Sequence, residues 1–333
     1  MLKNYLVEDK SIWDGRVDSV DDFDAYRWHQ WVELIDLNDE NLEPFDGKLG
    51  IAFLGFKCDK GVKRNKGRTG AAKGPKSIRH ELTNLPCQFP KDVKLFDAGN
   101  IISDEISLEE AQDSLAKAVE RVLELNMFPI LLGGGHEIAF GHYMGIFNHL
   151  KKKEEAEKIG IVNFDAHFDL RSYSDGGSSG TMFKQIADVT QKNEVDYSYF
   201  CIGIQKYGNT VSLFNTADKL GVEYIMAKEV ETMELYPMIE KLDDFLRKQD
   251  HIYITVCADV FSSAFAPGVS APQPLGLTPD RVLVFMKHVL RSSKTISFDI
   301  AEVSPRFDQD DATANLASVI VFSVVNTLAK IYC

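Results

Sequence analysis

Asp165, His167 and Asp169 have the residue types and the spacing of a metal site. They alternate along the chain, so an extended backbone would place all three side chains on one face. Carboxylates combined with imidazoles suit Mn²⁺ or a similar hard-to-borderline ion. Acids crowded together repel one another unless a cation neutralises them. The segment therefore predicts the centre of a metal site, and two ions sharing a carboxylate would give the two-metal route to a nucleophile at neutral pH.

Other residues of the same chemical kinds occur in three further places: His136 in Gly133-Gly134-Gly135-His136-Glu137, the pair Cys257 and Asp259, and Glu302. The glycines before His136 let the backbone turn tightly. Cys257 and Asp259 have the alternating spacing already seen in the first segment. The remaining histidines and cysteines lack such a context, and we interpret them as structural.

Each of these residues directly follows an apolar run with the character of a buried strand. The predicted strands are Leu49–Phe56, Val93–Phe96, Phe128–Leu132, Ile159–Phe164, Tyr199–Ile204, Val222–Ile225, Ile252–Val256 and Thr295–Ile300. Several of these runs are apolar throughout, which is typical of strands buried on both faces of a parallel sheet. In open α/β sheets, ligands bind beyond the carboxyl ends of the strands. Four of the predicted strands therefore deliver candidate ligands to one edge of a sheet.

Helical patterns lie between the predicted strands. One begins after a capping box of Ser107 and Glu110, and the others cover about 233–248, a stretch from Thr278-Pro279 onward, and about 313–331. This alternation predicts an α/β fold with helices on both faces of a mostly parallel sheet. No linker divides the chain, so we expect a single domain over residues 49–333. Residues 1–48 hold all three tryptophans, Trp13, Trp28 and Trp31, and are expected to form an arm packed on that domain.

Composition narrows the possible partners of the 333-residue chain. The formal net charge is -13, which disfavours nucleic acid or an anionic membrane as a partner. The five cysteines form no Cys-x-x-Cys pair. The first residues do not have the pattern of a secretory signal, and no apolar run approaches the length of a bilayer span. We expect a cytoplasmic protein that acts on a small molecule.

With these motifs in order, the chain resembles the arginase/agmatinase/formimidoylglutamase family of ureohydrolases. The resemblance runs from about Leu49 to Ala329 and rests on GGGHE at 133–137, NFDAHFDLR at 163–171 and CADVFSSAFAPGVSAP at 257–272. GVKRNKGRTGAAKGPKSIR at 61–79, SSGTMF at 178–183 and GIQ at 203–205 are most similar to the formimidoylglutamase branch. The resemblance implies a three-layer α/β/α fold around an eight-stranded parallel sheet, a pair of Mn²⁺ ions and a homo-oligomer. The implied reaction is hydrolysis of N-formimidoyl-L-glutamate to L-glutamate and formamide in histidine degradation.

The resemblance also implies roles for individual residues. Those of the metal ligands are His136 and Asp169 for one ion, His167 and Asp259 for the other, and Asp165 as a carboxylate shared by both. Glu302 matches the acid that orients the amidine group of the substrate, so Glu302 and Asp165 are the expected catalytic residues. Ser179 stands where arginases keep a proton-shuttle histidine, which is therefore absent here.

Cys257 departs from the family pattern, because the third signature normally begins with an aspartate that bridges both metals. Three interpretations stay open. Cys257 could bind as a thiolate and shift the preference toward Zn²⁺ or Fe²⁺. It could leave one metal site weak or empty. The chain could also be a non-catalytic protein that retains the fold. Because the other ligands and Glu302 are present, we favour an enzyme with altered metal affinity or stoichiometry.

The substrate class depends on cationic residues near this set. Arginine suits bidentate contacts with carboxylates, and the proposed substrate carries two of them. Arg171 lies two residues after Asp169, while Arg64, Asn65 and Arg68 lie in a glycine-rich loop after the first strand of the domain. We predict that Arg171 and Arg64 bind the glutamate moiety, with Asn65 and Ser179 also contacting the substrate. A solvated basic loop is the alternative for Arg64 and Arg68, and activity on agmatine, guanidinobutyrate or arginine is the alternative for the reaction.

Overall fold

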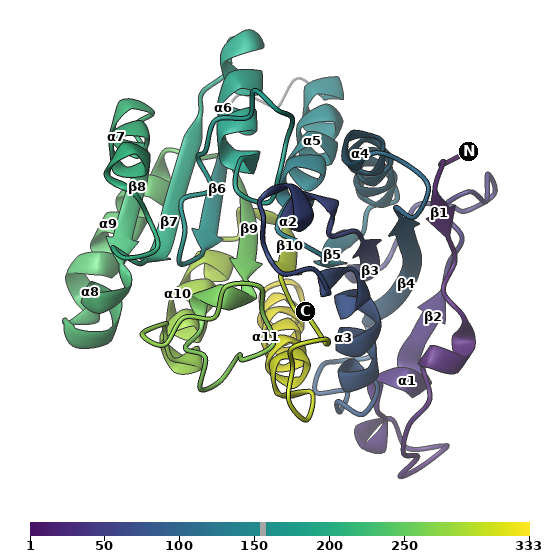
Figure 1. Cartoon of the computed structure of the whole chain (residues 1–333). Helices are drawn as coiled ribbons and strands as arrows, with labels where there is room; N and C mark the ends of the chain where they lie inside the picture. Colours follow the sequence, from purple (N-terminus) through teal and green to yellow (C-terminus); the bar gives the residue numbers. More distant parts are fainter. Residues whose placement is uncertain (154–157) are drawn as a thin grey trace.

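The computed structural model describes residues 1–153 and 158–333, and its strands form one ten-stranded sheet (Figure 1). The strands are β1 (Tyr5–Leu6), β2 (Val32–Leu34), β3 (Leu49–Lys57), β4 (Val93–Ile102), β5 (Phe128–Leu132), β6 (Ile159–Phe164), β7 (Ser198–Ile204), β8 (Glu223–Met226), β9 (His251–Cys257) and β10 (Thr295–Ala301). Across the sheet their order is β1-β4-β3-β5-β10-β9-β6-β7-β8, and β2 also pairs with β4. The β1–β4 pairing is antiparallel, whereas the other pairings are parallel. The predicted mostly parallel α/β sheet is confirmed.

The helices cover both faces of this sheet. They are α1 (Trp28–Trp31), α2 (Lys60–Arg64), α3 (Gly74–Leu82), α4 (Leu108–Glu124), α5 (Ile138–Lys152), α6 (Met182–Lys192), α7 (Val211–Lys219), α8 (Ala227–Thr232), α9 (Leu235–Arg247), α10 (Pro279–Arg291) and α11 (Ala312–Tyr332). Helices α3, α8, α9, α10 and α11 pack on one face, and α4, α5, α6 and α7 pack on the other (Figure 1). The architecture is therefore the expected three-layer α/β/α arrangement.

Strand β3 shows why the central strands are apolar throughout. Ile51 and Phe53 point into the core under α3 and α11, whereas Ala52 and Leu54 point into the core under α4 and α5. All four side chains are fully buried. Since successive side chains of a strand point to opposite faces, a strand between two helical layers needs apolar residues at every position.

The expected count of eight strands was too low. The eight predicted strands are all present, and β1 and β2 from the first 48 residues add two short ones at the β4 edge. Tyr5 pairs with Ile101, and Val32 pairs with Leu95. Two- and three-residue strands carry almost no periodic signal, and only the exposed edge of β4 makes them strands.

Strand β4 was also predicted too short, because its second half contains the polar residues Asp97 and Asn100. Both side chains are fully buried and are paired there. Arg79, also fully buried, donates to Asp97 Oδ2 at 2.8 Å and to Asn100 Oδ1 at 2.8 Å. Burial of ionised groups is tolerated when they are paired and hydrogen-bonded. Asp97 and Asn100 can therefore lie inside β4 because Arg79 of α3 pairs with them, and the sequence of the strand alone does not show that partner.

The three tryptophans of residues 1–48 all donate hydrogen bonds to later parts of the chain. Trp13 Nε1 donates to Asp97 Oδ2 at 2.7 Å, Trp28 Nε1 to the carbonyl of Pro86 and Trp31 Nε1 to the carbonyl of Val93. Trp28 also stacks on Phe53, with ring centroids 5.8 Å apart. These contacts attach the N-terminal residues to β3, β4 and the segment between α3 and β4.

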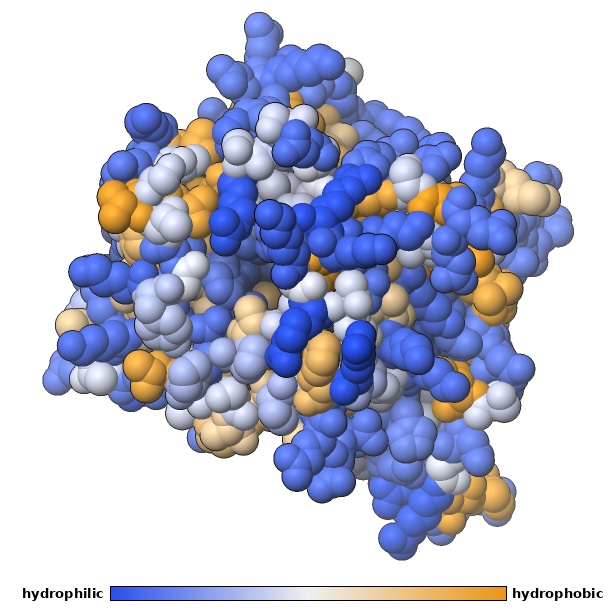
Figure 2. Space-filling view, in the orientation of Figure 1, coloured by the Kyte–Doolittle hydropathy of each residue, from blue (hydrophilic) through white to orange (hydrophobic). Residues whose placement is uncertain are grey.

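Helix α11 is long and apolar enough to cross a membrane by length and composition alone, contrary to the expectation that no run would be. Within the fold, 61% of its most apolar window is buried, and it packs against α3 and α10. That burial is typical of the core helix of a globular protein. The face of the molecule in Figure 2 is mainly hydrophilic, with hydrophobic residues in small separate groups.

Candidate metal centre

Four adjacent strands deliver the predicted ligands to one edge of the sheet. These strands are β5, β10, β9 and β6, which lie side by side in that order although they are not consecutive in the chain (Figure 1). Being parallel, they end at the same edge. The residues that follow or end them are His136, Glu302, the pair Cys257 and Asp259, and the Asp165–Asp169 segment. The strand order therefore brings together residues up to 166 positions apart, as in the hydrogen bond from the His136 amide to Glu302.

The turn after β5 depends on a close approach between backbones. A Cβ atom on Gly134 would lie 1.9 Å from the carbonyl oxygen of Cys58, so this position requires glycine. The Gly134 carbonyl accepts a 2.8 Å hydrogen bond from the Glu302 amide. The His136 amide donates to Glu302 Oε1 at 2.9 Å. The end of β5 thus fixes both the histidine and the glutamate.

Asp165 is the residue that links the two halves of the cluster. Its Oδ2 lies 3.0 Å from Nδ1 of His136, and its Oδ1 lies 3.4 Å from Nδ1 of His167. Asp169 Oδ2 lies 3.2 Å from His136 Nδ1, and Asp259 Oδ2 lies 3.2 Å from His167 Nδ1. Each carboxylate oxygen of Asp165 therefore faces a different histidine.

These atoms form two groups with the spacing of a metal site. One group contains His136, Asp165 and Cys257, and the other contains Asp165, His167 and Asp259; the ligand atoms of each group lie within 4.8 Å of one another. Asp165 belongs to both groups, as a shared ligand should. The two histidines fall in different groups, as the resemblance implied.

The backbone of the Asp165–Asp169 segment differs from the extended conformation that we expected. The chain bends at Ala166 and His167, and Asp169 has a φ of 50°, in the left-handed region. Glu302 is also left-handed, with a φ of 67°. Such conformations are uncommon outside glycine and collect at functional sites. The side chains converge because of this bend and not because of strand alternation.

The acids of the cluster do not titrate alike. Burial acts to raise the pKa of Asp165, but hydrogen bonds with His136 and His167 hold that pKa well below its usual value. Burial, followed by the charge of Asp165, raises the pKa of Asp169 to about 6. Burial also raises the pKa of Glu302 well above its usual value, and the carboxyl of Glu137 adds to that rise. Carboxylates crowded in one buried place cannot all ionise without positive charge beside them.

The nitrogen and sulfur donors hold protons in the absence of a cation. Burial alone would lower the pKa of His136, but hydrogen bonds and charge from Asp165 and Asp169 raise it well above the usual value. Burial and then the charge of Asp165 raise the pKa of the Cys257 thiol well above its usual range. Metal ligands must be deprotonated, so a bound cation would replace these protons.

Two buried carboxylate oxygens at the site lack hydrogen-bond partners among the described residues, which indicates a binding site for a cation or a hydrogen-bond donor. Asp259 and Glu302 are both buried, with each residue only 5% exposed. Within residues 1–153 and 158–333, neither Asp259 Oδ1 nor Glu302 Oε2 has a hydrogen-bond partner. A buried carboxylate oxygen without a partner is costly. Carboxylates and imidazoles around two neighbouring points are the donor set of divalent cations such as Mn²⁺. The residues present therefore fit a two-metal centre.

Most residues of the cluster line a cavity of about 320 Å³, although the fully buried Asp165 is not among the lining residues. Its lining includes nearly all of the predicted site residues and several others: Asn65, Lys66, Gly67, Arg68, His136, His167, Asp169, Arg171, Ser179, Cys257, Asp259, Ser270, Ala271 and Glu302. Arg171 is exposed at this cavity, and its guanidinium has no hydrogen-bond or ion-pair partner in the described part of the chain. It is free to bind an anion.

Arg64, in contrast, is not among the lining residues, although we predicted that it binds the substrate. Its guanidinium forms an ion pair with Glu109, with Nη2 3.1 Å from Oε2, and donates to the Gly177 carbonyl at 3.0 Å. Arg68 does line the cavity, but its guanidinium donates to the carbonyls of Val269 and Ser270 and lies over the Phe307 ring. Both arginines are thus engaged with the protein.

Lys66 is a lining residue that the sequence reasoning did not identify. It is exposed, and its ammonium has no partner among the described residues. Its position next to Asn65 in the predicted loop was the available signal, but nothing in the sequence separates Lys66 from the other cations of residues 60–68. Ser270 and Ala271 were quoted only as part of a signature.

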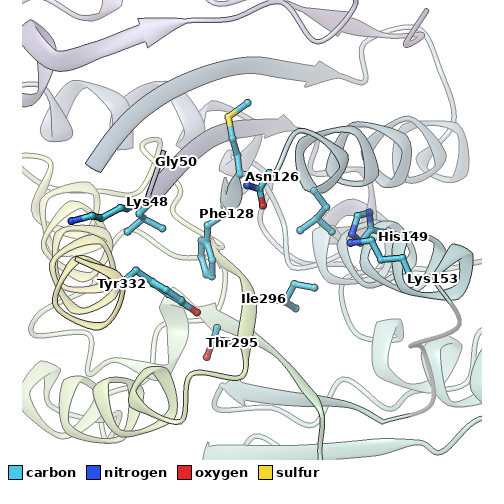
Figure 3. Close-up of a pocket in the computed structure, with 12 residues that line it drawn as sticks. Lys48, Gly50, Asn126, Phe128, His149, Lys153, Thr295, Ile296 and Tyr332 are labelled. Atoms are coloured by element: carbon cyan, nitrogen blue, oxygen red, sulfur yellow. The ribbon is translucent and has the colours of Figure 1, made fainter. Parts of the chain in front are cut away.

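A second cavity, of about 290 Å³, lies at the amino ends of the strands, opposite the metal centre (Figure 3). Its lining includes Leu49, Phe128 and Thr295, the first residues of β3, β5 and β10. Neither of the two metal-ligand groups found in the described residues lies there. Parallel strands separate this cavity from the metal centre by their full length.

The fold and the site define the class of protein. The Arginase family profile matches residues 49–326, and the chain belongs to this family. Over 330 residues it is 60% identical to the formimidoylglutamase of Clostridium tetani (strain Massachusetts / E88), a match that covers 99% of this chain and 98% of that protein. It is 41% identical over 314 residues to the formimidoylglutamase of Geobacillus sp. (strain WCH70), covering 94% of each.

Solved structures share the same fold. The formimidoylglutamase of Bacillus subtilis subsp. subtilis str. 168 superposes with a TM-score of 0.79 at 22% identity, covering 95% of this chain and 96% of that one. A Trypanosoma cruzi formiminoglutamase with Mn²⁺ superposes with a TM-score of 0.74 at 24% identity, covering 86% and 97%. The arginase-like fold class that we predicted is thus confirmed.

Proposed function

We propose that this protein hydrolyses N-formimidoyl-L-glutamate to L-glutamate and formamide. The observation that carries the proposal is one cavity, lined by most of the two-metal ligand cluster, at which a Glu302 oxygen and the guanidinium of Arg171 have no partner among the described residues. The similarity to formimidoylglutamases, at 60% identity over nearly the whole chain, supports the same conclusion. The activity is that of a hydrolase acting on C–N bonds in linear amidines, within histidine degradation.

The proposed metal ligands form two groups that share Asp165. They are His136, Asp165, Asp169 and Cys257 for one divalent ion, and Asp165, His167 and Asp259 for a second, Mn²⁺. A pair of such ions, when bound, supplies positive charge that lets a water act as nucleophile at neutral pH. Asp165 would contribute to catalysis as the shared ligand, with Oδ2 on the side of His136 and Oδ1 on the side of His167.

Glu302 is proposed to orient the amidine. Its Oε1 accepts the His136 amide hydrogen bond, which leaves Oε2 without a partner in the described chain and free to accept from a substrate N–H. Because burial raises the pKa of Glu302, a cationic amidinium beside it would stabilise the ionised carboxylate. The Glu302 carboxylate thus fixes which face of the amidine carbon points toward the metal centre.

Arg171 and Lys66 are proposed to bind the two carboxylates of the glutamate moiety. Both line the cavity, and neither has a side-chain partner within the described residues. The planar guanidinium of Arg171 suits a bidentate contact, and the ammonium of Lys66 acts as a point charge. Asn65 and Ser179 lie beside them in the lining and can donate to the same anions. Agmatine carries no carboxylate and would leave both cations without a partner.

The direct test is turnover by the full-length protein loaded with Mn²⁺ alone and, separately, with Mn²⁺ and Zn²⁺ together. We expect release of formamide and glutamate from N-formimidoyl-L-glutamate, and no urea from agmatine, 4-guanidinobutyrate or arginine. Urea release from one of those three substrates would replace the proposed reaction with another ureohydrolase activity. No turnover of any of the four with any divalent ion would leave a non-catalytic member of the family.

We further propose that residues 1–48 act as an arm on a single catalytic domain of residues 49–333, and that the protein is a cytoplasmic homo-oligomer. The tryptophan contacts to β3 and β4 support the arm. The net charge of -13 is in keeping with a protein that binds neither nucleic acid nor membranes. Sedimentation equilibrium of the purified protein would measure the oligomeric state, and a monomeric mass would contradict the oligomer.

A further inference from the structure

The two ligand groups of the centre differ in one atom type. The group around His136 contains the sulfur of Cys257, whereas the group around His167 contains only nitrogen and oxygen donors. Asp165 is common to both, so the difference lies in Cys257 on one side and Asp259 on the other. The two groups therefore share Asp165 but offer a metal ion different donor atoms.

Cys257 is placed to act as a ligand. It is the last residue of β9, is 2% exposed and still lines the cavity. Its sulfur lies within 4.8 Å of the ligand atoms of His136 and Asp165. Two residues further along the chain, Asp259 Oδ1 is buried without a hydrogen-bond partner among the described residues, which independently points to a cation-binding position.

Sulfur and oxygen donors select different ions. Thiolates favour Zn²⁺, Co²⁺ or Fe²⁺ over Mn²⁺, whereas carboxylates suit Mn²⁺ well. A thiol must lose its proton to the solvent before it binds, and a divalent cation in contact with the sulfur drives that loss. One sulfur in one of the two groups is therefore enough to give the two halves different preferences.

We propose that this centre binds two unlike divalent ions, a thiophilic ion such as Zn²⁺ or Fe²⁺ through Cys257 with His136 and Asp165, and Mn²⁺ through Asp165, His167 and Asp259. This inference rests on the proposed two-metal function and specifies its metals. It predicts that loading with Mn²⁺ alone fills only the half around His167 firmly. The protein would then need a mixed metal supply to become fully loaded.

The test uses Co²⁺ as a probe, because a thiolate bound to Co²⁺ gives a sulfur-to-metal charge-transfer absorption that nitrogen and oxygen ligands do not. We expect titration of the metal-free full-length protein to give this band, saturating at about one Co²⁺ per chain. The variant Cys257→Ser should lose the band. The variant Cys201→Ala, which removes the other buried sulfur near Asp165 and His167, should keep it.

Metal content gives a second readout that does not depend on activity. After loading with Mn²⁺ alone and removal of loosely held ions, the wild-type protein should retain about one Mn²⁺ per chain and Cys257→Asp about two; adding about one equivalent of Zn²⁺ to the Mn²⁺-loaded wild type should then bring its content to about one ion of each kind. Absence of the charge-transfer band in the wild type, or its persistence in Cys257→Ser, overturns the proposal. So does a wild-type chain that retains two Mn²⁺ as firmly as Cys257→Asp.

Failure of this inference is distinguishable from failure of the proposed reaction. A protein that releases formamide but shows no thiolate band would remain a formimidoylglutamate hydrolase with a centre of oxygen and nitrogen donors only. A protein that shows the band but turns over no substrate would keep its mixed centre and lose the proposed reaction.

Discussion

His136 Nε2 lies 3.0 Å from the hydroxyl of Thr255, on the opposite side of the ring from Asp165 and Asp169. The Thr255 hydroxyl donates to Asp299 Oδ1 at 2.6 Å, so its oxygen is left to accept a hydrogen from His136 Nε2. This contact keeps a hydrogen on Nε2, so Nδ1, which faces Asp165 and Asp169, is the nitrogen that would bind a metal. Outer partners of this kind orient the histidines of metal sites.

Replacing Thr255 with valine should weaken metal binding. The substitution keeps the shape of the side chain but removes both the acceptor for His136 and the donor to Asp299. We expect the affinity for the divalent ion held by His136 to fall about 10-fold to 100-fold, as measured by Co²⁺ titration of the metal-free protein. Thr255→Ser keeps the hydroxyl and should stay near the wild-type affinity. Equal losses in both variants would mean that packing, and not the hydrogen bond, is what matters at this position.

Replacing Glu302 with glutamine should abolish most turnover while leaving metal content unchanged. The glutamine carbonyl can still accept the His136 amide hydrogen bond, but an NH₂ group then stands where Oε2 was to meet the amidinium. We expect kcat/KM for N-formimidoyl-L-glutamate to fall at least about 100-fold. Elemental analysis supplies the control. A variant with wild-type turnover would remove Glu302 from the proposed mechanism.

Arg171 and Arg64 form a matched pair of variants for substrate binding. Arg171→Ala removes the uncommitted guanidinium at the cavity, whereas Arg64→Ala removes one already paired with Glu109. We expect KM to rise about 10-fold to 100-fold in the first variant, with kcat much less affected, and to change little in the second. Steady-state kinetics of both decide the matter. The opposite order of effects would restore Arg64 as a substrate ligand.

The attachment of the N-terminal residues should depend on pH through Glu8. Burial acts to raise the pKa of Glu8, but the Asn100 hydrogen bond and the charges of Arg79 and Lys57 lower it below its usual value. A lowered carboxyl pKa stabilises the fold above the unfolded pKa, and the stabilisation is lost as pH falls through the folded pKa. At pH 7 we expect Glu8→Gln to lower the free energy of unfolding by about 1 kcal/mol.

Denaturant unfolding of the wild type and Glu8→Gln at neutral and acidic pH measures this difference. The gap should close at a pH below the folded pKa of Glu8, because both side chains are then neutral. A gap that is constant with pH would mean that the variant acts through shape and not through charge.

Local patterns in the sequence were enough to predict most of the strands and the candidate chemistry at their ends. Apolar runs between helical patterns located eight of the ten strands, because burial under two helical layers leaves a local signal along most of the inner ones. The Asp165–Asp169 segment and His136 were likewise recognisable, since their residue types and neighbours lie within a few positions of one another. The Asp165–Asp169 segment remains the predicted centre of a metal site.

How these segments come together depends on the packing of the folded chain. Strands β10 and β9 lie between β5 and β6, so Glu302 and Cys257 reach the same centre as His136 and Asp165. The left-handed backbone of Asp169 and Glu302 aims their side chains, and no residue pattern announces it. Glu109, 45 positions from Arg64, withdraws that arginine from the cavity and leaves Arg171 and Lys66 at the mouth. Strand order, backbone strain and ion pairing depend on contacts between distant residues, and a local pattern carries no information about them.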